Sequence, residues 1–369
     1  MRKMYNMKVL AWMGSVVLAS VLAFLLLAWL IPPFKAPEPS RQLFTIRHQE
    51  LRDNNPLYTD LFLQSIKHNN GYLVLGTSES NNLTEGNYYD FLNADTSLNI
   101  GFSVVAGAGR TPCTYFPLIQ SNENVRGLKV IFTINPRYWC TPYARSNKHY
   151  FGRYVSTAEY KRANRSKNKL VNDILKINWS HVPLVNRIGD GMCLFLDRLR
   201  RKYYQDLVFD LKPDKFSRSL HYLERQKRLD EYPGFGKLDS TQYDFEHNVA
   251  KGYNVNENIF AVDTSVTYRY DELRAMISVC KDHGVDITFV VGPYNKLAFE
   301  KASPGEVPLL DEVCHHIMDL CRQENVPYID ATDMSDMPGV FKDIQHHNSD
   351  GAYFIYLKIK DYVLEKENR

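Results

Sequence analysis

The chain is short of cysteine, of net charge and of long apolar runs. Six cysteines occur in 369 residues without paired spacing, so the sequence lacks the disulfide framework of a small secreted scaffold. We expect most of them to be small buried apolar residues. The formal net charge is only +3 and 44% of the residues are hydrophobic, which argues against disorder. No internal repeat is evident, and the length suits one large domain or two modest ones.

Only one apolar run is long enough to cross a membrane. Residues 9–31 contain no charged residue, and as a helix they would span about 34 Å, against a hydrocarbon core of roughly 30 Å. Arg2, Lys3 and Lys8 precede the run and no acidic residue does, so the positive-inside rule places residues 1–8 in the cytoplasm. We therefore expect an uncleaved transmembrane anchor, with a cleavable signal peptide as the alternative.

The rest of the chain would then lie on the outer side of the cell membrane. Four prolines make residues 32–40 a stiff stalk, and residues 41–369 would form the extracytoplasmic domain. Within it, residues 141–265 carry little strand signal, so we expect a largely helical insertion. Residues 144–232 hold 20 Lys and Arg against 10 Asp and Glu, a net of +10. This region is either a solvated face or a surface for anionic lipid or polymer, and its location excludes nucleic acid as a partner.

Short apolar runs alternate with amphipathic segments in the rest of the domain. This alternation predicts an α/β fold, a doubly wound parallel sheet of three layers that the helical insertion interrupts. We expect strands at residues 72–75, 98–100, 128–134, 285–291 and 327–330. We expect helices within 41–69, beginning near 116–119, and at 268–283, 307–325 and 351–367, whereas 81–93 reads as a polar, turn-rich stretch.

A small polar stretch follows the first predicted strand. Gly76 permits a tight turn there, and Ser78 comes two residues later. Open α/β sheets keep their chemistry at the carboxyl ends of strands, so Ser78 is a candidate nucleophile. The alternative is a turn in which Thr77 and Ser78 cap a helix.

A serine hydroxyl is a weak nucleophile and needs a base within hydrogen-bond reach. Asp343 stands three residues before His346, in a segment between the last predicted strand and the last predicted helix. The carboxylate can fix the tautomer of the imidazole and stabilise the imidazolium that forms when the serine gives up its proton. We therefore expect His346 to be the base and Asp343 its orienting acid.

Catalysis of this kind also needs donors for a developing oxyanion. The candidates are the backbone N–H groups of Ser78 and Gly101 and the side-chain amide of Asn135. Each follows a predicted strand, and the carboxyl ends of parallel strands meet at one edge of a sheet. The structural alternatives are a turn glycine at 101 and a cap at 135.

The histidines do not predict a metal site. His315, His316, His346 and His347 occur as two adjacent pairs, and neighbouring residues on a helix point in different directions. No cysteine or carboxylate cluster completes a ligand set. We expect neither a metal ion nor another cofactor.

Four short motifs, in this order, resemble the blocks of the SGNH hydrolase superfamily: Gly76-x-Ser78, Gly101, Asn135 and Asp343-x-x-His346. The Gly-Thr-Ser-Glu sequence at 76–79 is also similar to the Gly-Ser-Ser-Glu motif of the DltD family of D-alanyl transfer proteins.

That resemblance implies an acyl-enzyme on Ser78, with His346 as base and Asp343 as its partner. It implies O-acylation of teichoic acid or a related cell-surface glycan from an acylated donor, alongside a membrane-bound O-acyltransferase. Two alternatives stay open. One is a non-catalytic scaffold that recruits the membrane acyltransferase, and the other is a plain SGNH carbohydrate esterase.

Overall fold

The structure is a computed structural model, and it describes residues 2–30, 63–64, 66–67, 70–81, 87–95, 97–98, 100–106, 111–120, 125–140, 261–263 and 267–368. The predicted stalk at 32–40, most of the predicted helix within 41–69 and nearly all of the predicted insertion at 141–265 lie outside these ranges.

The described core is a sheet of five parallel strands in the order β2-β1-β3-β4-β5. The strands are β1 (Tyr72–Gly76), β2 (Phe102–Ala106), β3 (Lys129–Ile134), β4 (Asp286–Val291) and β5 (Tyr328–Asp330). Along the chain, β1 is followed by a strand on one side and then by a strand on the other. The carboxyl ends of β1 and β3 therefore flank a topological switch point, where open α/β sheets bind their ligands.

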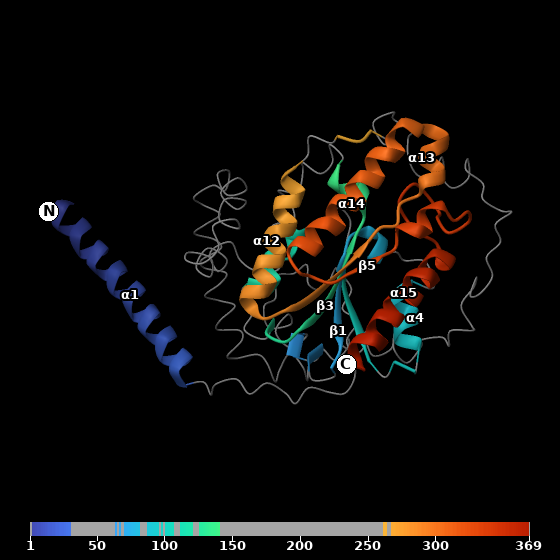
Figure 1. The fold of residues 1–369 in the computed structure, drawn as a ribbon. Helices are drawn as coiled ribbons and strands as arrows, with labels where there is room; N and C mark the ends of the chain where they lie inside the picture. The colour runs from blue at the N-terminus through green and yellow to red at the C-terminus, as the bar shows by residue number, and fades with distance from the viewer. Residues whose placement is uncertain are drawn as a thin grey trace.

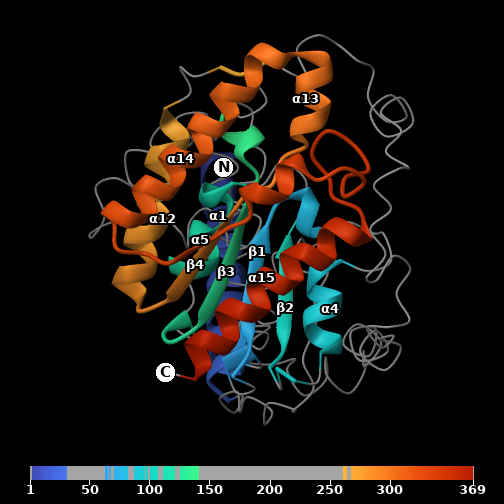
Figure 2. The same ribbon diagram turned by 45° about the vertical axis from the view of Figure 1, so that its right-hand side comes forward.

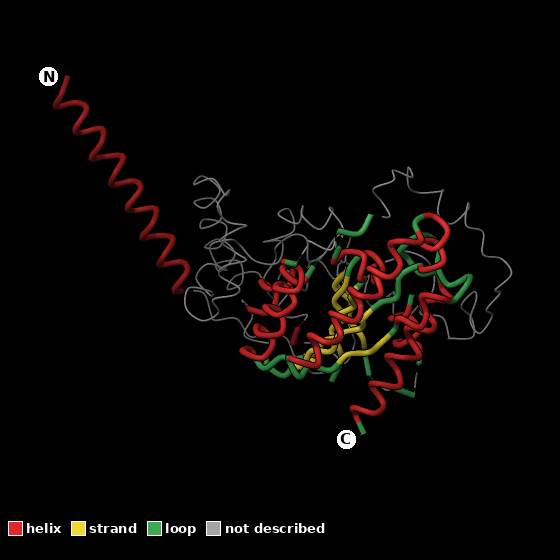
Figure 3. Tube along the Cα trace, turned by 45° about the horizontal axis from the view of Figure 1, so that its top comes forward, coloured by secondary structure: helices red, strands yellow, loops and turns green. Residues whose placement is uncertain are grey.

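Helices cover both faces of the sheet (Figures 1 and 2). One face carries α5 (Pro112–Gln120), α12 (Tyr268–His283) and α14 (Val307–Gln323), and the other carries α4 (Tyr88–Ala94) and α15 (Ser349–Glu367). In Figure 3 the strands lie between these two groups of helices. This arrangement shows the α/β fold that the alternating pattern predicts.

The burial of β1 explains its unbroken apolar sequence. Successive side chains of a strand point to opposite faces, and here both faces are covered. Leu73 and Leu75 pack with the α5, α12 and α14 side, whereas Tyr72 and Val74 pack with the α4 and α15 side. All four side chains are fully buried.

Three expectations about local structure are wrong. The second strand is β2, not residues 98–100, because the chain makes a turn around Leu98, where the backbone N–H of Leu98 donates to the carbonyl of Asp95. The predicted turn-rich stretch at 81–93 contains most of α4 (Tyr88–Ala94), which a capping box of Asn87 and Asp90 starts. The helix expected near 116–119 begins earlier, at Pro112.

The remaining predicted strands and the helices at 268–283, 307–325 and 351–367 are confirmed to within a few residues. Their ends carry recognisable signals: α12 stops at Gly284, which has a φ of 66°, and Asn348 caps α15 by accepting hydrogen bonds from the N–H groups of Asp350 and Gly351. A short helix that the sequence did not suggest, α13 (Lys296–Ala302), follows β4.

The amino-terminal segment is a helix, α1 (Arg2–Leu30). In the part of the chain that the structure describes, no helix is long and apolar enough to cross a membrane, so the structure lends the expected anchor at 9–31 no support.

The chain leaves the described core after Cys140 and re-enters it at 261–263. These two ends meet, because the backbone N–H of Asp263 donates to the carbonyl of Cys140 at 2.5 Å. Cys140 is buried and free, as are Cys280, Cys314 and Cys321, which confirms the expectation for these four cysteines.

Candidate active site

Ser78 lies just beyond the carboxyl end of β1, at the first position of a 3₁₀ turn, η1 (Ser78–Asn81). Between residues 71 and 80 it is the one residue that is not buried. The turn requires Gly76, because a Cβ atom there would collide with the side chains of Ser80 and Thr133. The sequence thus ends a buried strand in a tight turn that exposes a single hydroxyl.

Ser78, His346 and Asp343 form a continuous hydrogen-bonded chain. The Oγ of Ser78 lies 2.8 Å from Nε2 of His346, and Nδ1 of the same imidazole lies 2.7 Å from Oδ2 of Asp343. Residues 268 positions apart in the chain therefore meet at hydrogen-bond distance. This is the geometry in which an imidazole accepts the proton of a serine while a carboxylate holds its other nitrogen.

Asp343 is held as an ionised acceptor. Burial opposes its ionisation, but hydrogen bonds from the His346 ring and from the backbone N–H groups of His346 and Gln345 outweigh burial and keep the pKa of Asp343 below its ordinary value. Its Oδ1 accepts both backbone N–H groups, at 2.6 and 2.9 Å, which leaves Oδ2 for the imidazole. The carboxylate can therefore fix the tautomer with the proton on Nδ1.

The segment that carries the base is tied down at several points. Phe341 and His347 form an antiparallel bridge, and the side-chain amide of Asn295 donates to the carbonyl of Asp343 at 2.9 Å. Gly351 lies so close to the carbonyl of Val340 that a side chain there would collide with it. The loop before α15 thus has a defined position relative to β1.

The structure does not bring Gly101 to this site. Gly101 precedes β2, and its carbonyl accepts a hydrogen bond from the N–H of Tyr72, the first residue of β1. It therefore lies at the amino end of the sheet, about five residue rises of 3.3 Å, or roughly 16 Å, from the level of Gly76. The expectation that Gly101 follows the second strand is wrong, because that strand begins at Phe102, after Gly101, and not at Leu98.

Asn135 does lie at the site, at the carboxyl end of β3. Its Oδ1 accepts the backbone N–H of Arg137 at 2.9 Å and so caps the short turn η3 (Pro136–Trp139). Its Nδ2 donates to Oε1 of Glu79 at 2.6 Å and to the carbonyl of Gln345 at 3.5 Å. The amide is thus placed where the sequence predicts, but it already has protein acceptors, and its action on an oxyanion stays a prediction.

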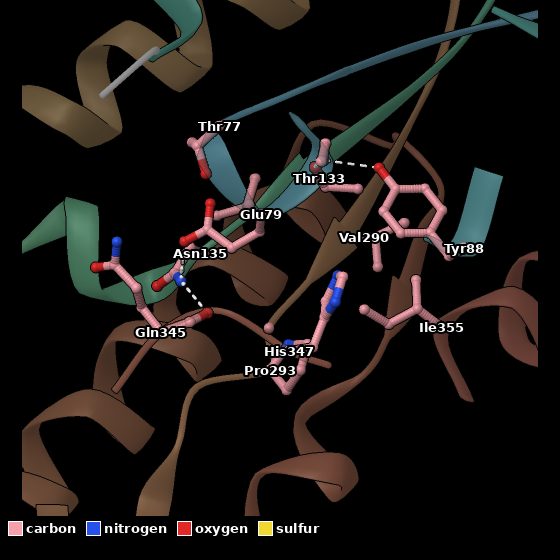
Figure 4. A pocket seen from close by; sticks show the side chains of 13 residues that line it. Thr77, Glu79, Tyr88, Thr133, Asn135, Val290, Pro293, Gln345, His347 and Ile355 are labelled. Atoms are coloured by element: carbon pink, nitrogen blue, oxygen red, sulfur yellow. Dashed lines mark hydrogen bonds between the residues drawn. The ribbon is translucent and has the colours of Figure 1, made fainter. Parts of the chain in front are cut away.

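Glu79 carries a buried carboxyl next to the candidate nucleophile. The sequence motif at 76–79 includes this residue but predicts no role for it. Oε2 has no hydrogen-bond partner, and burial raises the pKa of this group, which the nearby His346 and the Asn135 amide only partly oppose. Glu79 lines a cavity of about 20 Å³, room for a water molecule, together with Asn135, Tyr88 and His347 (Figure 4). Burial thus favours the neutral form of this carboxyl, which directly follows Ser78 in the chain.

Two more polar side chains lie at the site without having been predicted. Gln345 and Arg137 are buried, and Nη1 of Arg137 donates to Oε1 of Gln345. The Nε2 of Gln345 lies 3.4 Å from Nε2 of His346. The one available signal was position: Gln345 adjoins the predicted base and Arg137 follows the predicted Asn135.

The four histidines considered as metal ligands are separated. His315 and His316 lie on α14, where His315 approaches the carbonyl of Asp311 and the ring of His316 lies tilted against the ring of Tyr270. His347 is buried against the edge of Tyr88. Within the described ranges, no group of three or more His, Cys, Asp or Glu is placed to hold a metal ion.

Comparison with known proteins gives little beyond this geometry. No protein-family model and no curated protein matches the chain. Among solved structures, the crystal structure of a GDSL-like lipase from Bacteroides thetaiotaomicron matches with 8% identity and a TM-score of 0.36, over 84% of this chain and 99% of that one. At that TM-score the likeness carries no argument, so the parallel α/β fold rests on the strand pairing itself.

Proposed function

We propose that this protein is a serine acyl hydrolase or acyltransferase that forms an acyl-enzyme on Ser78. The supporting observation is the hydrogen-bonded chain from the Ser78 hydroxyl through His346 to Asp343, at 2.8 and 2.7 Å. It stands at the carboxyl edge of the sheet, beside the switch point between β1 and β3.

The chemistry runs in two steps. Ser78 Oγ bonds to the carbonyl carbon of an acyl donor while its proton moves to Nε2 of His346, and the carbonyl electron pair moves onto oxygen. When that pair returns, the bond to the leaving group breaks and the leaving oxygen takes the proton from His346. An acceptor hydroxyl or water then gives its proton to Nε2 of His346 and attacks the acyl carbon. When the bond from that carbon to Ser78 breaks, Oγ takes the proton back from His346.

The finer proposal is acyl transfer of the DltD type. The Gly-Thr-Ser-Glu sequence at 76–79 and the Asp343-x-x-His346 motif support it. In this proposal the acceptor is a hydroxyl of teichoic acid or a related cell-surface glycan, and a membrane-bound O-acyltransferase works alongside. The location outside a cell membrane rests on the sequence alone, that is, on the uncharged residues 9–31 behind a basic amino terminus.

Labelling with a fluorophosphonate tests the acyl-enzyme directly. The probe should label the wild-type chain and not Ser78→Ala. Ser303→Ala is the matched control, because Ser303 lies at the far end of α13 and makes no capping hydrogen bond through its side chain. Equal labelling of the wild type and Ser78→Ala would refute the proposal.

A second experiment separates catalysis from scaffolding. A deletion strain is complemented with wild type or with Ser78→Ala, and glycan acylation is measured. Failure of Ser78→Ala with intact binding of the membrane acyltransferase supports catalysis, whereas full complementation supports the scaffold. Release of free acid instead of acylated glycan would support a plain esterase.

A further inference from the structure

Gln345 and the candidate nucleophile approach the same atom of His346. Its Nε2 lies 3.4 Å from the same imidazole nitrogen, Nε2 of His346, that Ser78 Oγ approaches at 2.8 Å. The side chain comes from the residue directly before the base, and only 6% of Gln345 is exposed. A primary amide is therefore buried against the atom that takes and returns the proton.

The orientation of this amide is set from the other side. Nη1 of Arg137 donates to Oε1 of Gln345. Turning the amide over would place its NH₂ against the guanidinium, so that two donors would face each other, because an arginine has no acceptor. The backbone of Arg137 is fixed beside the site, because its N–H donates to Oδ1 of Asn135. Nε2 of Gln345 thus faces the reacting atoms.

The contact from Gln345 to His346 is long in the resting site, and the reaction removes its acceptor. Neutral His346 has one lone pair on Nε2, and Ser78 lies nearer to it than the amide does. Once Nε2 takes the serine proton, that lone pair is gone. The new acceptor nearby is the negatively charged oxygen on the carbon that Ser78 has just bonded.

We propose that Gln345 is a catalytic residue whose amide N–H donates to the oxyanion of the tetrahedral intermediate, and that Arg137 is its positioning residue. This rests on the proposed function. Of the three donors that the sequence predicts for the oxyanion, Gly101 lies at the opposite end of the sheet and the amide of Asn135 donates to Glu79. The backbone N–H of Ser78 is the remaining one, and Gln345 would add a second. An interaction that strengthens only as charge develops accelerates the chemical step rather than binding.

The experiment is steady-state hydrolysis of p-nitrophenyl acetate across a pH series by wild type and Gln345→Met. We expect the plateau kcat to fall about 100-fold with KM within about twofold, as for loss of one oxyanion donor. Phenylboronic acid, which forms a tetrahedral adduct with the serine, should bind Gln345→Met more weakly by a similar factor. A variant that keeps the wild-type plateau and only moves the pH midpoint would show that Gln345 merely tunes His346, and would overturn the proposal.

Arg137→Met provides the second arm. It frees the amide to turn over, so we expect a smaller fall in kcat than in Gln345→Met, and no further fall when both substitutions are combined. The double variant also removes both buried polar partners, so it serves if Gln345→Met fails to fold. Independent, multiplicative losses in the double variant would contradict the positioning role of Arg137.

The controls separate this proposal from the one on which it rests. If wild type releases p-nitrophenol and Ser78→Ala does not, the acyl-enzyme proposal stands. A wild-type plateau of kcat in Gln345→Met then refutes only the role of Gln345. If wild type and Ser78→Ala are equally inactive and equally labelled by the phosphonate, both proposals are wrong.

Discussion

Replacing Asp343 with asparagine should strongly lower the rate of ester hydrolysis while leaving the fold intact. Oδ1 of Asp343 accepts two backbone N–H groups, so the oxygen of an asparagine must stay on that side. Its NH₂ then faces Nδ1 of His346, which has to become an acceptor. The imidazole proton moves to Nε2, and that nitrogen can no longer take the proton of Ser78.

The expected loss follows from this change of tautomer. A wrong tautomer at an intact triad costs about 10⁴-fold in kcat. The fold should barely change, because asparagine still accepts both backbone hydrogen bonds. Asp343→Ala differs, since it leaves two part-buried N–H groups without this acceptor, at up to about 1–3 kcal/mol each.

The assay combines initial rates of ester hydrolysis with urea unfolding for both variants. The matched control is Asp333→Asn, because Asp333 is an exposed carboxylate paired with Lys358 on the surface. Asp333→Asn should keep both rate and stability. A rate for Asp343→Asn within tenfold of wild type would refute the assignment of Asp343 as the group that sets the tautomer.

Three further predictions concern the groups around the nucleophile. Burial lowers the pKa of His347 from 6.5 to about 4, so the unfolded chain takes up the proton at a higher pH than the folded chain does. The free energy of unfolding should therefore fall as pH drops from 6.5 toward 4, by up to about 3 kcal/mol. A His347→Phe variant with the same pH slope in urea unfolding would contradict this. Burial raises the pKa of Glu79 above 4.5, so its contribution to stability is present below 4.5 and lost as pH rises. The stability of Glu79→Gln relative to wild type should therefore grow from pH 4.5 upward, and a constant difference would count against a buried neutral carboxyl. Gly76→Ala should cost about 1–3 kcal/mol in thermal unfolding and lower kcat, because its Cβ collides with Ser80 and Thr133, whereas Gly305→Ala has open space and should do neither; equal stability of the two variants would show that the turn can relax.

The sequence predicts those parts of the site that depend on local order along the chain. Buried parallel strands are apolar runs that end in small polar residues, so β1 and β3 could be located, and with them Ser78 and Asn135. The pairing of Asp343 with His346 is a three-residue contact within one loop. These are short-range features, and a reader of the sequence has all the residues that determine them.

The wrong predictions have two different causes. For β2, Leu98 to Ile100 and Phe102 to Ala106 are both short apolar runs beside one glycine, and only pairing with β1 decides between them. For α4 the signal was present, since Asn87 and Asp90 have the spacing of a capping box. The polar composition of residues 81–93 is typical of turns, and it outweighs that spacing when the two are read together.

The roles of Gln345 and Glu79 could not be inferred from order along the chain. The amide of Gln345 takes its direction from Arg137, 208 residues away. The carboxyl of Glu79 accepts a hydrogen bond from Asn135, 56 residues away, and burial within the folded chain raises its pKa. Each property belongs to a contact between distant segments rather than to a motif.

The hydrogen bond between Asp263 and Cys140 has a topological consequence. It joins the two positions at which the described chain leaves and re-enters the core, on the way from β3 to the neighbouring parallel strand β4. A connection of any length can start and end at adjacent points, so the pairing of these two strands sets no limit on the length of residues 141–260.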